Sequence, residues 1–192
     1  QETMLTSLPM FHSFGMTVCM NLAMYMGGAM ILIPNPRVLE HTLKSINKHK
    51  PTVFPGVPAL YVSLTNRPDI NEYDVSSIKA CISGAAGLPA EVQESFEKLT
   101  GGKLVEGYGL SEATPVTHCN PIHGKRKQGS WIGLPMPDTV ATIKDLETGE
   151  NELGPGDIAE LCIQGPQVMK GYWNMPTETA NTLRDGQRVS PR

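Results

Sequence analysis

The sequence predicts an α/β fold, with a mostly parallel sheet flanked by helices and followed by a small β-rich module. Short β-branched runs alternate with segments of helical apolar spacing over the first two thirds of the chain. After about Gly124 short strand-like runs are separated by polar turn clusters instead. We therefore expect residues 1–124 to form the α/β part, 125–186 a β-rich module of the same domain, and 187–192 an unrelated tail.

The expected strands of the α/β part are short apolar runs bounded by Gly, Pro or polar residues. They are Met4–Leu8, Ala29–Ile33, Thr52–Phe54, Ile78–Ser83 and Lys103–Glu106. The expected helices between them are Met16–Met26, Val38–His49, Pro58–Thr65 and Pro89–Leu99. Val38–His49 is the clearest of these, because its apolar residues recur at helical spacing and its basic residues gather near its end, where they suit the helix dipole.

The β-rich module is predicted from two short apolar runs that are separated by turns. We expect strands at Val140–Lys144 and Ile158–Gln164, with turns at 147–150 and 154–157. Pro176–Leu183 is expected to be a closing helix, since Pro176 suits a first helical position and Glu178 suits the first turn.

Composition restricts the class of protein. The chain of 192 residues is 40% hydrophobic and 18% charged, which is typical of a soluble folded domain. Its net charge of −3, from 16 basic and 19 acidic residues, gives no reason to expect nucleic-acid binding. The scattered cysteines predict free thiols in a reducing cytoplasm.

Two tempting interpretations are disfavoured. Cys119 lies near His118 and His123, but no second close pair of ligands completes a zinc site. The apolar stretch 16–33 is broken by polar residues and glycines, so we interpret it as a core helix and strand rather than a membrane span.

The first candidate binding feature is the loop Ser83–Pro89, which joins an expected strand to an expected helix. Its small residues Gly84, Ala85 and Ala86 would let the backbone approach a flat or anionic ligand, and the helix start adds N–H donors. On these residues alone, a simple tight turn explains the loop equally well.

The second candidate feature follows the next expected strand, where Gly107, Tyr108, Gly109, Ser111 and Glu112 occur together. Both loops follow strands, so they should open at one sheet edge. The tyrosine ring could lie on a base, the serine hydroxyl could bond a phosphate oxygen, and the glutamate suits Mg²⁺. A core aromatic and a solvated acid are the alternatives for single residues, but the clustering favours a site.

The third candidate feature is the turn Leu8–Gly15, which contains His12 between Phe11 and Phe14. A histidine here could line a substrate pocket or act near a carboxylate. A packing role beside the two phenylalanines is the open alternative.

In their order and spacing, these segments resemble the adenylate-forming, or AMP-binding, enzyme family of acyl-CoA synthetases, luciferases and adenylation domains. The motifs that carry the resemblance are Leu8–His12, Ser83–Pro89, Tyr108–Glu112, Ile132–Pro135, Glu160–Pro166 and Gly171–Trp173. The resemblance extends from about Leu5 to Gly186, and it is closest to long- and medium-chain fatty acyl-CoA synthetases.

The resemblance implies a ligase that joins a fatty or other carboxylic acid to CoA through an acyl-adenylate, using ATP and Mg²⁺. It places Tyr108 against the adenine, with Gly107 and Gly109 beside it, Ser111 at the α-phosphate, and Glu112 on the metal ion. It implies that Gly84, Ala85 and Ala86 line the adenine and acyl pocket by their backbone, and that His12 lies at the acyl-carboxylate end, with Met16 near the acyl channel. Many relatives have threonine at the position of Ser111, and serine keeps the hydroxyl.

The sequence also departs from the family pattern. The lysine-bearing phosphate loop is absent from the 192 residues, as are the ribose-binding Thr-Gly-Asp expected after Gly186 and the carboxyl-terminal domain with its lysine. We therefore expect a central fragment of an acyl-CoA synthetase that is inactive in isolation.

Several alternatives stay open from the sequence. They are an aryl-CoA ligase, a luciferase-like enzyme, an amino-acid adenylation domain, and a noncatalytic nucleotide-binding α/β module. Peripheral membrane contact and a homodimer of the full-length parent are also open.

Overall fold

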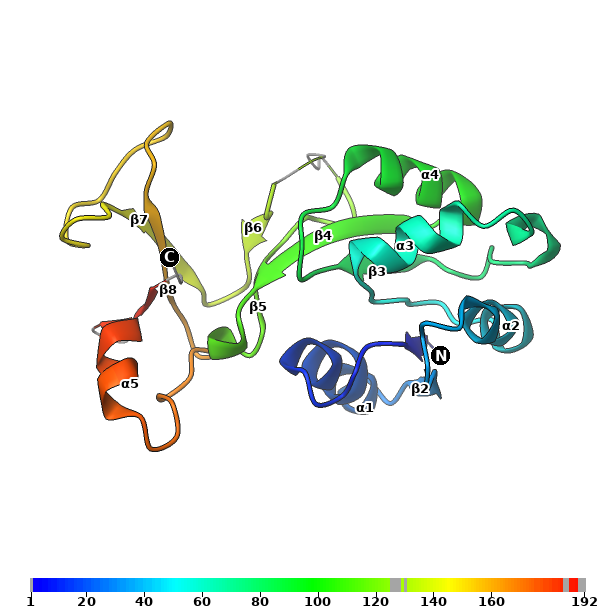
Figure 1. Cartoon of the computed structure of the whole chain (residues 1–192), viewed down its shortest axis with the longest axis horizontal. Helices are drawn as coiled ribbons and strands as arrows, with labels where there is room; N and C mark the ends of the chain where they lie inside the picture. The colour runs from blue at the N-terminus through cyan, green and yellow to red at the C-terminus, as the bar shows by residue number, and fades with distance from the viewer. Residues whose placement is uncertain (1, 125–128, 130, 185–186, 190–192) are drawn as a thin grey trace.

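A parallel sheet forms the centre of the α/β part (Figure 1). The computed structural model describes residues 2–124, 129, 131–184 and 187–189. Strand β1 (Thr3–Thr6) pairs in parallel with β2 (Ala29–Leu32), and β3 (Ala80–Ser83) pairs in parallel with β4 (Lys103–Gly109). Val53 joins the two pairs through parallel bridges to Met4 and Ala80, so the expected strand Thr52–Phe54 is reduced to a bridging residue.

Beyond β4 the sheet continues in antiparallel fashion. β5 (Val116–Cys119) pairs antiparallel with β4, and β6 (Leu134–Pro135) pairs antiparallel with β5. These two short strands were not predicted from the sequence. They extend the sheet beside the end of β4 where the glycine-bearing segment lies.

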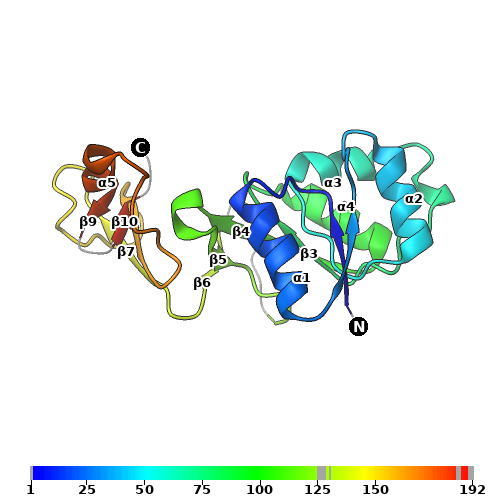
Figure 2. The same cartoon turned by 90° about the horizontal axis from the view of Figure 1, so that it is seen from below.

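Helices cover the sheet on both faces. α3 (Pro58–Thr65) and α4 (Ala90–Thr100) lie on one side of β3 and β4, and α1 (Leu22–Tyr25) lies on the other (Figures 1 and 2). α1 continues a π-helix, η1 (Gly15–Asn21), and α2 is Leu39–His49. Two single-turn 3₁₀ helices, η2 (Ile70–Glu72) and η3 (Ser111–Ala113), complete this part.

The core lies between the sheet and helices α2, α3 and α4. Phe54, Tyr61 and Phe96 form an aromatic cluster whose ring centroids are 4.8–6.5 Å apart. Tyr61 is buried, and its hydroxyl donates to the Phe54 carbonyl oxygen at 2.8 Å, which satisfies the polar atom. This packing fixes the strands that lead to the site.

The apolar stretch 16–33 differs from the expectation of a buried core. Cys19, Ala23 and Ile33 are buried, but Met24 and Met26 are each 68% exposed and Tyr25 is 88% exposed. The helix buries only the face that packs against Met4 and its neighbours, so its outer face stays open. Within the described residues, no helix combines the length and apolarity that crossing a bilayer requires.

The β-rich module forms a lobe at one end of the molecule (Figure 1). β7 (Val140–Lys144) pairs antiparallel with β8 (Glu160–Gln164), so the second expected strand begins two residues later than predicted. α5 spans Pro176–Thr182, β9 is Leu183–Arg184 and β10 is Gln187–Val189, and the strand order is β7-β8-β10-β9.

The expected tail is partly built into this sheet. Gln187–Val189 pairs with β8 on one side and β9 on the other, although the sequence suggested that 187–192 is unrelated to the module. Residues 125–128, 130, 185–186 and 190–192 lie outside the described residues. The proposed boundaries at 124/125 and 186/187 therefore stay predictions.

Candidate functional site

The three candidate segments meet in one pocket at the carboxyl ends of β3 and β4. The pocket has a volume of about 300 Å³. It is lined by His12, Ser13, Phe14, Ile82, Gly84, Ala85, Gly107, Tyr108, Gly109, Leu110, Ser111, Glu112, Pro115 and Val116. Parallel strands that end at the same edge explain why segments about 25 residues apart or more converge here.

The loop after β3 approaches the pocket by its backbone. Gly84 is buried, and a Cβ there would lie 2.9 Å from the Phe14 ring. The Gly84 N–H donates to the Gly56 carbonyl oxygen at 3.1 Å, and Ala85 follows with a φ of 70°. Ala86 does not line the main pocket but borders an adjoining hollow of about 340 Å³. The loop thus presents small residues to both cavities.

The end of β4 is kept thin by its glycines. A Cβ at Gly107 would lie 2.8 Å from Ile82 Cδ1, and one at Gly109 would lie 1.8 Å from the Pro115 carbonyl oxygen. The pairing with β5 shifts register between Tyr108 and Gly109. Tyr108 is half-buried and lines both the main pocket and the adjoining hollow, so its ring lies at their boundary.

Ser111 and Glu112 lie on the single turn of η3, directly after β4. The turn is closed by the Leu110 N–H, which donates to the Pro115 carbonyl oxygen at 2.8 Å, and Thr114 ends it in a left-handed conformation. Ser111 is exposed and Glu112 is half-buried, and both line the pocket. A hydroxyl and a carboxylate therefore face the same space.

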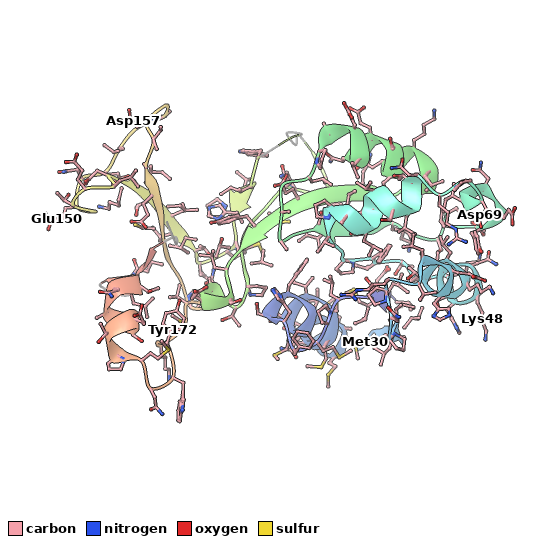
Figure 3. The ribbon with its side chains drawn as sticks, in the orientation of Figure 1. Met30, Lys48, Asp69, Glu150, Asp157 and Tyr172 are labelled. Carbon is pink, nitrogen blue, oxygen red and sulfur yellow. The ribbon has the colours of Figure 1, made fainter. Side chains whose placement is uncertain are left out.

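The Glu112 carboxylate also accepts a hydrogen bond from the Tyr172 hydroxyl. Tyr172 lies on the segment between β8 and α5, where it is labelled in Figure 3. In the sequence this tyrosine stands out only as part of the family motif Gly171–Trp173. The two residues are 60 positions apart, and neither local spacing nor periodicity indicates the contact.

His12 also lines the pocket, and it lies within the segment between β1 and η1. Its side chain is exposed, and its Nδ1 accepts a hydrogen bond from the Phe14 N–H at 3.1 Å. Because Nδ1 is the acceptor in this hydrogen bond, Nε2 is the ring nitrogen left to donate to a ligand. Phe14 is buried against Gly84, whereas Met16 is not among the residues that line the pocket.

Two titratable groups near the site are affected by burial. Burial raises the pKa of Glu106, which precedes Gly107 on β4. Burial lowers the pKa of His118 on β5, whose Nδ1 lies 3.0 Å from the Thr117 hydroxyl and whose ring faces Tyr108. In both groups burial disfavours the charged form.

The donors in the pocket fit a cation that shares its coordination with a ligand. Glu112 contributes a single carboxylate, and no group of three or more His, Cys, Asp or Glu side chains in the described part of the chain could hold a metal ion. Mg²⁺ is commonly bound by one or two carboxylates together with substrate phosphates and water. The site suits that mode rather than a metal centre built from protein alone.

The model of the AMP-binding enzyme family matches residues 1–173. The chain belongs to this family. The resemblance to adenylate-forming enzymes is thereby confirmed. All six of the motifs that suggested it lie within the matched residues.

The curated proteins that the chain resembles include CoA ligases. The chain is 57% identical over 185 residues to a long-chain-fatty-acid–CoA ligase of Bacillus subtilis (strain 168). This alignment covers 96% of the chain and 32% of the relative. It is 35% identical over 187 residues to a 4-coumarate–CoA ligase of Pinus taeda, and this alignment covers 95% of the chain and 34% of the relative. The chain spans about a third of the length of the curated relatives it matches.

Solved structures of the same kind share the fold. ATP-bound MatB from Rhodopseudomonas palustris matches with a TM-score of 0.85 and 31% identity, over 99% of this chain and 37% of that one. The anthranilate CoA ligase AuaEII in complex with anthranoyl-AMP matches with a TM-score of 0.91 and 22% identity, over 99% of this chain and 36% of that one. The predicted α/β fold class is confirmed.

Proposed function

We propose that the chain is part of an AMP-forming acid–CoA ligase, which activates a fatty acid with ATP and transfers the acyl group to CoA. The observation that carries the proposal is the pocket itself, where the Gly84 loop, the Tyr108–Glu112 segment and His12 meet. Membership of the AMP-binding family and the CoA-ligase relatives support the same reaction.

In the first proposed step, a carboxylate oxygen of the acid attacks the α-phosphorus of ATP. The bond from that phosphorus to the bridging oxygen breaks, which releases pyrophosphate and leaves an acyl-adenylate. The CoA sulfur then attacks the acyl carbon, and AMP leaves with the oxygen that joined it to the acyl group. Both steps depend on alignment and charge neutralisation more than on a protein nucleophile.

The chain's residues can serve these needs from their positions. We propose that Tyr108 lies along the adenine, with Gly107 and Gly109 keeping the strand thin beside it. The Ser111 hydroxyl would donate to an α-phosphate oxygen. Gly84, Ala85 and Ala86 would approach the adenine and acyl group by backbone, since they present little side-chain bulk.

Glu112 would hold Mg²⁺ together with the ATP phosphates. The metal ion supplies neutralisation of the charge that develops on the phosphate oxygens. Glu112 suits this role because its carboxylate lines the pocket beside Ser111 and accepts a hydrogen bond that limits its rotation.

The acid is proposed to enter near His12. Its Nε2–H can donate to a carboxylate oxygen of the acid, because Nδ1 is occupied as an acceptor. The nearby lining is apolar, with Phe14, Ile82 and Val116. A fatty acid is preferred over an aromatic one because the 57% identical relative is a long-chain-fatty-acid–CoA ligase, whereas the aromatic-acid ligase is 35% identical.

The setting of the full-length protein is also proposed. We expect it in the cytoplasm, with no nucleic-acid partner, and we keep peripheral membrane contact and a homodimer as open proposals. The 192-residue chain is expected to be inactive alone, since its sequence contains no lysine-bearing phosphate loop or ribose-binding Thr-Gly-Asp.

ATP–pyrophosphate exchange in the full-length protein tests the proposal. Exchange should depend on a fatty acid, with a higher kcat/KM for C12–C18 acids than for 4-coumarate, amino acids or anthranilate. CoA addition should then yield acyl-CoA and AMP. A preference for an aromatic or amino acid would replace the substrate class, and nucleotide binding without exchange would favour the noncatalytic alternative.

A further inference from the structure

The segment after β8 returns to the turn that carries Glu112. The Met169 N–H donates to the Glu112 carbonyl oxygen at 2.8 Å, and the Thr114 hydroxyl donates to the Gln167 carbonyl oxygen at 2.8 Å. The third contact is the hydrogen bond from Tyr172 to Glu112 Oε1. The β-rich lobe therefore holds η3 at three points, and one of them is the carboxylate in the pocket.

Tyr172 is itself held in place by α5. Its N–H donates to Thr179 Oγ1 at 2.9 Å, and that hydroxyl donates to the Met175 carbonyl oxygen at 2.8 Å. Gly171 has a φ of 147°, and a Cβ there would lie 2.7 Å from Thr179 Cγ2. Because the backbone before Tyr172 packs closely on α5, the position of its ring is determined by this lobe.

A hydroxyl on Oε1 is compatible with metal binding by the same carboxylate. Two carboxylate oxygens offer about four lone-pair directions, so one hydroxyl and one cation can share the group. Carboxylates that bind metal ions are commonly oriented by such outer hydrogen bonds, and removal of the outer partner typically weakens metal affinity or activity by about 10–100-fold.

We propose that Tyr172 is a positioning residue, whose hydroxyl orients the Glu112 carboxylate toward a divalent cation bound with the phosphates of ATP. The inference rests on one part of the proposed function, the cation role of Glu112. It adds that the β-rich lobe takes part in the metal site through a side chain that does not itself line the pocket.

A purely structural role is the competing explanation, in which the hydrogen bond only ties the lobe to η3. The Thr114 hydroxyl provides a matched control, since it joins the same two segments without touching the carboxylate. Thr114→Val removes that hydroxyl and keeps a β-branched side chain at a φ of 51°. The conformational cost of this backbone position is therefore similar in the variant and in the parent.

The test compares Tyr172→Phe and Thr114→Val in the full-length protein. The first measurement is the affinity for Mn²⁺ in the presence of a non-hydrolysable ATP analogue, by electron paramagnetic resonance. The second is the Mg²⁺ concentration that gives half-maximal ATP–pyrophosphate exchange. Tyr172→Phe should weaken Mn²⁺ binding and raise the half-maximal Mg²⁺ concentration by about 10-fold or more. Thr114→Val should change both by less than about twofold.

The outcomes separate this inference from the proposed function. Equal Mn²⁺ affinities for Tyr172→Phe and the parent, or equal losses in both variants, would overturn the positioning role. If Glu112→Gln weakens Mn²⁺ binding but Tyr172→Phe does not, the cation role of Glu112 stands and the inference fails. If Tyr172→Phe weakens Mn²⁺ binding but no acid supports exchange, the inference stands and the ligase function fails.

Discussion

Glu112 concentrates the chemistry of the pocket at the scale of single residues. It is the acidic side chain that lines the pocket beside the Ser111 hydroxyl. We predict that Glu112→Ala slows ATP–pyrophosphate exchange in the full-length protein by about 100-fold or more, because a metal ion contributes several kcal/mol of charge stabilisation. The melting temperature should stay within a few degrees of the parent's.

Glu91 offers a matched control for this substitution. It is exposed in the first turn of α4 and does not line the pocket. Glu91→Ala should leave exchange unchanged. If Glu112→Ala catalysed ATP–pyrophosphate exchange at the parent's rate, the proposed Mg²⁺ role of Glu112 would be wrong.

His118 gives the fold a dependence on pH. Burial lowers its pKa below the ordinary value of 6.5, so between the two values the unfolded chain binds more protons than the folded one. The contribution of His118 is fully present above about 6.5 and is lost as the pH falls toward the folded-state pKa. We predict that the free energy of unfolding of the full-length protein decreases between pH 7 and 5.5, as measured by urea denaturation.

The change in the free energy of unfolding with pH distinguishes the contribution of His118 from that of other groups. His118→Asn should reduce the slope over that range, whatever its effect on stability at pH 7. Parallel curves for the variant and the parent would show that His118 does not titrate differently in the two states.

Most residues that line the pocket could be predicted from the sequence, but the contact from Tyr172 that holds Glu112 could not. Gly84, Tyr108, Ser111 and Glu112 follow strands that apolar runs predict, and strand ends of a parallel sheet meet at one edge. Tyr172 reaches Glu112 through the folding of a separate lobe. No local pattern records such a distant contact. The roles of these residues stay predictions.

At the scale of elements, the glycines of β4 determine how closely the segment after it can fold back. A Cβ at Gly109 would lie 1.8 Å from the Pro115 carbonyl oxygen, so the backbone itself must move. We predict that Gly109→Ala lowers the free energy of unfolding by about 3 kcal/mol, as for severe overpacking. Urea denaturation of the full-length protein would measure the loss.

Gly154 is the matched control for this change. It lies in the turn between β7 and β8, and a Cβ there would meet no atom within 4 Å. Gly154→Ala should change stability by less than about 0.5 kcal/mol. Equal effects of the two substitutions would contradict the close packing of Gly109.

The elements that the sequence predicted are those with a strong local pattern. α2 follows from apolar residues that recur at helical spacing, and α3 and α4 lie where apolar segments between the expected strands were predicted to be helical. β5 and β6 were missed because they are very short and are stabilised by antiparallel pairing with distant residues rather than by a local alternation. The same reason explains why Gln187–Val189 was expected to be a tail.

At the scale of the whole molecule, ligand binding to the pocket would show whether these 192 residues form a binding unit. We predict that a non-hydrolysable acyl-adenylate analogue raises the melting temperature of the chain, since ligand at 100 times its Kd adds about 2.7 kcal/mol of stability. Tyr108→Ala should abolish the shift, because its ring lines both cavities.

Tyr25→Ala serves as the control for the melt. Tyr25 is 88% exposed on α1 and lines neither cavity, so this variant should keep the full shift. A cooperative melt without any shift would mean that adenylate binding needs residues outside this chain.

The open outer face of α1 has a practical consequence for work with the chain. Met24, Tyr25 and Met26 present a contiguous run of large apolar side chains to solvent. At the concentrations used for crystallisation or NMR, we expect the isolated chain to self-associate through this surface, and its yield in soluble form to depend on temperature and on mild detergent. Charged replacements such as Met24→Lys and Met26→Glu should improve solubility without altering the pocket, because neither residue lines it.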